Sequence, residues 1–409
     1  MKLWGAALHL SSLVAPPPPA PATTTTTLAK SFTRRTEPQQ TQSSASVLLR
    51  DGISSWLVSA DTTTAPEPTK ADVQLLRQAF AEFYGANRDL IKSEAMLSQV
   101  IESWEQQSND ERAALYRVRG DCYTLLSDAA RAVTDYDTAI RLLNTPDGKA
   151  KADPSELPAA LLGRARAIKA SGGASLTMDR AKQAASDYEQ YLTLTSREEW
   201  DTDEELIEDG AARNPYAAWE WGTVLRCTGD YGRASSAHAL AAQSFAEIGD
   251  KARSVISLLD AGIDAAAAGR VDDAIVTLQR AIAQTPGVSG NDVRLLQRVI
   301  AKEGEGRLAL AALLWNSDTV KDGKQQAEKI LGDACVRLEQ MQAQQSTNKA
   351  PKSATTTAVV STGLRFSIDD ALPDAMDVSC YKFKNPVFLN QLGWPTELQK
   401  KVIKLETLR

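Results

Sequence analysis

Residues 116–142 read YRVRGDCYTLLSDAARAVTDYDTAIRL, and the spacing of small and large residues in this stretch decides the fold. Counted from Gly120, a tyrosine stands at +3, an alanine at +12, a second tyrosine at +16 and a second alanine at +19. Small side chains at these intervals let two helix axes approach to about 8–10 Å, and the larger residues fill the gaps beside them. The stretch therefore predicts two antiparallel helices joined by a tight turn.

The same spacing recurs from Gly222 and again from Gly262. Both copies have a glycine at +7, Gly229 and Gly269, where the first helix is expected to end in a residue with positive φ. The later copy has a proline at +24, Pro286, which is expected to stop the second helix. Three copies of one spacing indicate a repeat array.

This pattern resembles the tetratricopeptide repeat, and the resemblance implies an all-α solenoid of helical hairpins. Weaker copies around Met96, Ala184 and Ala327 give about six helix pairs between Lys70 and Gln342. The step from Gly222 to Gly262 exceeds the common period of about 34 residues, so either the helices or their connection must be longer there.

The chain divides into four parts by composition. Residues 1–65 are interpreted as a disordered targeting presequence, 66–345 as the solenoid, 346–362 as a polar linker and 363–409 as a C-terminal module. The last part is too short for a large core of its own, so we expect it to cap the array or to dock a partner.

The beginning of the chain has the composition of a targeting signal. Residues 1–36 contain no Asp or Glu, and a short apolar stretch is followed by the small-residue pattern Ala20-Pro21-Ala22. The Thr-, Ser- and Gln-rich residues that follow carry Arg34, Arg35 and Arg50, and the two stretches in series resemble the bipartite presequences of complex plastids. The alternatives are a plastid import signal followed by a lumen-directing signal, or a low-complexity terminus without a targeting signal. Phrases such as YRVRGDCY and LLQRVIAKEGE are similar to plant and algal plastid tetratricopeptide-repeat proteins, which implies the stroma or the thylakoid lumen.

Composition argues against several classes of function. The net charge is -6, and a nucleic-acid binder usually carries a basic footprint. The only histidines are His9 and His238, the latter expected to pack between helices, and no catalytic or phosphate-binding motif occurs. No run of eighteen apolar residues exists, so no membrane span is expected. We therefore expect neither an enzyme nor a cofactor.

Two charged stretches have simple structural interpretations. Residues 201–209 hold the densest acidic cluster, but Leu206 stands where a calcium loop needs glycine, so a helix start is favoured over a metal-dependent enzyme. The stretch KEGEG at 302–306 is interpreted as helix punctuation. The pairing of the four cysteines, at positions 122, 227, 335 and 380, is left open by their spacing.

A candidate binding surface follows from the expected solenoid, because the first helix of each pair lines its concave face. The residues placed there, a basic and aromatic strip, are Arg117, Asp121, Arg166, Lys169, Tyr216, Trp219 and Arg226. One interpretation makes them anchors for a partner peptide. The other has the arginines pair with acids of neighbouring helices.

The resulting hypothesis is a plastid scaffold, and in particular an assembly factor for a photosynthetic complex, that binds other proteins in its groove. A permanent structural subunit of a larger plastid complex is the alternative.

Overall fold

The computed structural model describes residues 68–85, 88–172, 177–197, 201–290, 292–317, 320–347, 385–391 and 394–405. These residues form helices and connecting turns, with no β-strand among them. The expected presequence, 1–65, lies outside the described residues. Of the expected linker, 346–362, the first two residues belong to the helix Gly323–Thr347, and the rest lies outside the described residues. None of the described helices is long and apolar enough to cross a membrane.

The helices, in chain order, are α3 (Lys70–Tyr84), α4 (Leu90–Ser103), α5 (Asn109–Leu125), α6 (Ala129–Leu143), α7 (Pro146–Lys151), α8 (Glu156–Gly172), α9 (Met178–Thr195), α10 (Asp203–Arg213), α11 (Pro215–Cys227), α12 (Tyr231–Glu247), α13 (Lys251–Ala267), α14 (Val271–Gln284), α15 (Val293–Trp315), α16 (Gly323–Thr347), α17 (Pro386–Gln391) and α18 (Thr396–Ile403).

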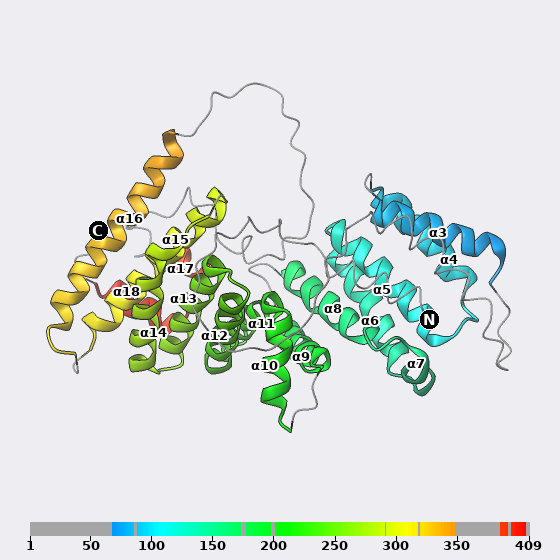
Figure 1. Cartoon of the computed structure of the whole chain (residues 1–409), viewed down its shortest axis with the longest axis horizontal. Helices are drawn as coiled ribbons and strands as arrows, with labels where there is room; N and C mark the ends of the chain where they lie inside the picture. Colours follow the sequence, from blue (N-terminus) through cyan, green and yellow to red (C-terminus); the bar gives the residue numbers. More distant parts are fainter. Residues whose placement is uncertain are drawn as a thin grey trace, which may run out of the picture.

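The fold is the all-α solenoid expected from the sequence. Figure 1 shows the helices following one another along the long axis, from α3 and α4 at one end to α15 and α16 at the other. Successive helices pack as antiparallel pairs: α3 with α4, α5 with α6, α8 with α9, α11 with α12, α13 with α14, and α15 with α16. Short helices α7 and α10 are inserted between pairs, so the array is irregular.

Glycine turns join the helices of the central pairs. Gly229 and Gly269 have φ of 78° and 80°, as predicted, and Gly249 adopts 83° in the turn from α12 to α13. In each turn the backbone N–H after the glycine donates to a carbonyl five residues earlier, as from Asp250 to Phe245 at 2.8 Å. The connection after α12 is therefore short, and the extra residues of this repeat lengthen α12 and α13 to 17 residues each.

The small residues of the repeat lie where two helices touch. Gly222 faces the ring of His238, Gly120 faces Tyr136, and Gly262 faces a leucine at the same +16 position. His238 is fully buried, which confirms its predicted packing role. α14 ends at Gln284, directly before the 3-10 turn that contains proline, so the predicted stop of this helix is confirmed.

The interpretation of KEGEG as helix punctuation was wrong. Residues 302–306 lie in the middle of α15, which continues without interruption to Trp315. Lys302 and Glu305 are buried, and Gly306 packs against Leu259 of α13. The stretch is polar because it takes part in a buried ion-pair network, which a single-helix pattern does not reveal.

The C-terminal residues return to the array. α18 packs against α15 and α13, so residues far apart in sequence lie together at this end of the molecule. Cys335 of α16 is disulfide-bonded, whereas Cys122 and Cys227 are free thiols. The fourth cysteine, Cys380, lies outside the described residues.

The packing of Gly222 predicts the effect of a single methyl group. In Gly222→Ala the new Cβ would stand 2.7 Å from the His238 ring, so we expect overpacking to lower the free energy of unfolding by about 1–3 kcal/mol. The control is Gly232→Ala in α12, whose Cβ meets only Asp230 Oδ1 at 3.9 Å, and which should be neutral or slightly stabilising. Urea denaturation of both variants measures this, and equal stabilities would contradict it.

Candidate partner-binding surface

The predicted strip lies on three first helices, α5, α8 and α11, and most of its residues are engaged in ion pairs between helices. Four of the seven, Arg117, Arg166, Lys169 and Arg226, form these pairs. Asp121 pairs with Arg117 within α5, and Trp219 donates a hydrogen bond to Asp260. All seven residues are half-buried or buried. We call the resulting series of pairs, from Arg117 on α5 to Lys302 on α15, the ion-pair ladder.

The first rung of the ladder joins α5 to α8. Arg117 Nε donates to Glu156 Oε2 at 2.8 Å, and Arg117 Nη1 donates to Asp121 Oδ2 at 2.6 Å. Tyr136 donates its hydroxyl to the other oxygen of Asp121 at 2.6 Å. The Arg117 side chain is only 1% exposed, so this arginine holds two helices together from within.

The second rung joins α8 to α11. Arg166 Nε donates to Glu220 Oε2 at 2.9 Å, and Glu220 is fully buried. Lys169 Nζ lies 3.9 Å from the other Glu220 oxygen and 5.0 Å from the centroid of the Trp219 ring. The side chains of Arg166 and Lys169 remain 24% and 21% exposed, so both reach the surface beside this rung.

The third rung joins α11 to α13. Arg226 lies between two carboxylates: Nε donates to Asp264 Oδ1 at 2.6 Å and Nη2 donates to Asp260 Oδ1 at 2.9 Å. Trp219 donates its indole N–H to Asp260 at 3.2 Å, and His238 Nδ1 lies 2.7 Å from Asp264 Oδ2. Each of these side chains thus contacts a side chain on another helix, although the second ring nitrogen of His238, Nε2, is buried without a hydrogen-bond partner.

The fourth rung joins α13 to α15. Lys302 Nζ lies 2.9 Å from Asp260 Oδ1 and donates to Glu305 Oε2 at 3.1 Å. Burial alone raises the pKa of the Asp260 carboxyl, but the nearby Lys302 and Arg226 cations outweigh burial and hold this pKa well below its usual value. Asp260 therefore stays ionised between two cations. Burial raises the pKa of Glu156 at the opposite end, where Arg117 only partly offsets it.

Tyr216 is the predicted residue that stands apart from the ladder. Its ring packs edge-on against Phe245 at 5.0 Å between centroids, and Arg253 lies 5.5 Å from its ring centroid. The structure thus shows the inter-helix pairing of Arg117 and Arg166 that the second interpretation expected. Unlike the surface pairs of that interpretation, both pairs contain a carboxylate that is almost fully buried, Glu156 or Glu220. The role of the seven residues in partner binding stays a prediction.

The acidic stretch 201–209 begins a helix. Thr202 caps α10, and the first turn carries three acids, which the helix dipole favours. Asp209 accepts from Ser196, from the backbone N–H of Arg197 and from Arg213. Within the described ranges, no three His, Cys, Asp or Glu side chains come together in a way that would hold a metal ion.

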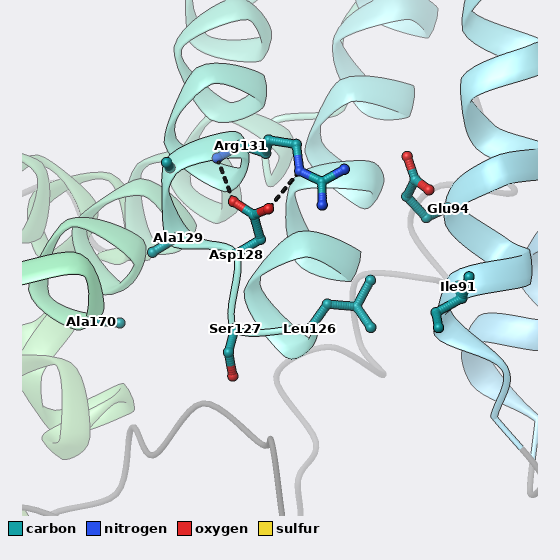
Figure 2. Close-up of a pocket in the computed structure, with 9 residues that line it drawn as sticks. Ile91, Glu94, Leu126, Ser127, Asp128, Ala129, Arg131 and Ala170 are labelled. Atoms are coloured by element: carbon teal, nitrogen blue, oxygen red, sulfur yellow. Dashed lines mark hydrogen bonds and ion pairs between the residues drawn. The ribbon is translucent and has the colours of Figure 1, made fainter.

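An open hollow of about 800 Å³ lies beside the turn from α5 to α6, and none of its lining residues belongs to the ladder. Figure 2 shows Ile91 and Glu94 of α4 on one side and Leu126, Asp128 and Arg131 on the other. The pair of Asp128 and Arg131 is satisfied internally at 2.6 Å. The hollow therefore presents mixed apolar and polar edges without a converging set of groups.

Apart from Asp121, the acids of the ladder were missed from the sequence. Glu156, Glu220 and Asp264 each stand on the helix of the following repeat, between 38 and 54 residues from the arginine they bind. The sequence did hold a signal for them: each first helix that carries one of these arginines is followed by a first helix that carries an acid.

Comparisons with known proteins leave the chain without an assigned family. No protein-family model matches it, and no curated protein matches it. Among solved structures, BtubC (BKLC) from P. vanneervenii is 17% identical with a TM-score of 0.40, over 67% of this chain and 98% of its own. The apo form of RapI is 14% identical with a TM-score of 0.42, over 82% and 99%. Both similarities are low in sequence identity and in TM-score.

The third rung predicts a large cost for removing its cation. Arg226→Leu leaves two carboxylates facing each other in a buried site, and we expect it to lower the free energy of unfolding by about 3–5 kcal/mol. The control is Arg131→Leu, because Arg131 is 59% exposed and pairs with Asp128 at the surface, worth about 0–1 kcal/mol. Urea denaturation distinguishes them. Similar losses in both variants would show that the rung has no special role.

Proposed function

We propose that this protein is a non-catalytic scaffold that binds a protein partner along the inner face of its first helices. The observation that carries this proposal is a row of charges held in place by buried acids. Arg166 and Lys169 keep part of each side chain at the surface while Glu220 fixes their positions, and the more buried Arg226 continues the row between Asp260 and Asp264.

A fixed row of charges suits partner binding for an energetic reason. Ordering a long side chain at an interface costs about 0.5–1.5 kcal/mol, and a side chain already held by its neighbours loses less on binding. Lys169 on α8 lies over the buried indole of Trp219, and Arg166 pairs with Glu220 beside it, so two cations are held next to each other at the surface. This chemistry fits an acidic or carboxylate-bearing peptide segment.

We further propose a plastid location, in the thylakoid lumen, and a role as an assembly factor for a photosynthetic complex. Support comes from the acid-free residues 1–36. It also comes from the disulfide at Cys335, because disulfides persist in oxidising compartments.

Lys169 offers the sharpest test of the binding surface. Lys169→Glu places a second carboxylate near Glu220, but the Lys169 contact is long, at 3.9 Å, and Arg166 still pairs with Glu220 at 2.9 Å. The chain should therefore fold with some loss of stability while the charge beside Trp219 is reversed. The control is Lys151→Glu on α7, a residue 45% exposed and away from the ladder. We expect a partner captured from plastid extract to bind the control like the wild type and the Lys169→Glu chain at least about tenfold more weakly.

Binding constants of the purified partner, with circular dichroism of all three chains, give the answer. Equal affinity for Lys169→Glu and the control would contradict groove binding. Recovery only in a salt-resistant assembly that ignores both changes would favour a permanent structural subunit.

The compartment has a separate test. A fusion of residues 1–65 to a fluorescent protein should enter plastids, and the full chain should fractionate with lumen proteins. Its Cys335 should there be protected from alkylation until a reductant is added. Retention in the cytosol, or a freely alkylated Cys335, would contradict the proposed location.

A further inference from the structure

The C-terminal segment, residues 385–391 and 394–405, buries five of its large apolar side chains almost completely, whereas Val387 and Ile403 are exposed. Leu389, Trp394, Leu398, Val402 and Leu405 are each at most 4% exposed. A segment of about twenty residues is far too short to bury five large side chains against itself. Their burial therefore comes from the surface of the array.

That surface belongs to first helices. α18 packs against α15 and α13, the first helices of the last two pairs, and Asn316 at the end of α15 donates to the carbonyl of Lys401 at 3.4 Å. The segment thus lies on the same series of helices as the ion-pair ladder. It covers the C-terminal end of that series, whereas Arg166 and Lys169 lie further towards the N-terminus.

One polar contact gives the docking site its specificity. Trp394 donates its indole N–H to Glu305 Oε2 at 3.2 Å, and the same oxygen accepts from Lys302. Lys302 in turn contacts Asp260, which accepts from the indole of Trp219. The Glu305 carboxylate is therefore a hydrogen-bond acceptor on a largely apolar docking surface, and a docked segment must place an N–H donor opposite it.

The segment also has a prearranged shape. The Trp394 backbone N–H donates to the carbonyl of Leu389 at 2.9 Å, and Gln399 donates to the carbonyl of Trp394 at 2.6 Å. The turn between α17 and α18 is closed by these bonds. In sequence, 37 residues separate the segment from the end of α16 at Thr347, so it is joined to its site as a tethered ligand is.

We propose that the inner face of α13 and α15 is a peptide-binding site whose resident ligand is residues 385–405. The site takes a segment with a tryptophan followed by apolar residues at +4 and +8, as in Trp394, Leu398 and Val402. A partner segment of that chemistry binds by displacing the resident one. This proposal rests on the proposed scaffold function and adds a second site to it, distinct from the surface around Lys169.

The experiment uses the full chain and a fluorescent peptide with the sequence of residues 385–409. Trp394→Ala in the chain weakens its own segment and frees the site, so the peptide should bind this variant at least about tenfold more tightly than it binds the wild type. The matched control is Ile403→Ala, on the same helix but 44% exposed, which should bind like the wild type. A peptide carrying Trp394→Ala should bind neither.

A second measurement covers the case in which Trp394→Ala disturbs the fold. Excess unlabelled peptide added to the wild-type chain should speed backbone hydrogen exchange in residues 385–405, with exchange in α5 and α6 unchanged. No acceleration, together with equal peptide affinity for wild type and Trp394→Ala, would overturn the proposal and make the segment a permanent cap. Neither assay needs a natural partner, so this failure would leave the Lys169 test untouched.

Discussion

The arrangement of the array depends on charge pairing between consecutive first helices, of which Arg226 between Asp260 and Asp264 is the fullest case. In a repeat array each unit contacts only its neighbours, so its shape is set by the interfaces between them. Alanine-lined contacts tolerate small slips along the helix axis. A buried guanidinium does not, because a carboxylate left without its cation is costly. The ladder therefore selects one offset for each successive pair, and the inner surface follows from it.

The parts of the fold that the sequence predicted are those encoded within one repeat. Gly222 and His238 stand 16 residues apart on two helices that touch, and Gly229 ends the first of them, so spacing alone locates both. The ion pairs of the ladder, in contrast, join residues that belong to different repeats. Arg166 and Glu220 are 54 residues apart, and no period within a hairpin relates them. The stretch around Lys302 was interpreted as a helix boundary for the same reason, because its ion-pair partner Asp260 lies on a different helix pair.

The proposed binding surface combines two kinds of chemistry along one series of helices. Towards the N-terminus, Arg166 and Lys169 remain at the surface and are anchored by Glu220. Towards the C-terminus, the floor formed by α13 and α15 is already occupied by the segment that carries Trp394. A continuous series of ion pairs links the two ends, because Asp260 contacts Arg226 on one side and Lys302 on the other. In the proposed scaffold, the charged site around Lys169 is therefore open, whereas the apolar site on α13 and α15 is covered by the C-terminal segment.

The turn at Gly249 has a consequence for local stability. It has the same conformation and hydrogen bond as the turns inside the neighbouring pairs, so α11 to α14 form a run of helices with equally tight connections at every step. The opposite end differs, because the hollow beside Ile91 separates part of α4 from the turn that follows α5. The packing of α4 against α5 is also less extensive than that of α12 against α13. We therefore expect local unfolding to begin at the N-terminal pair, while the central helices stay folded.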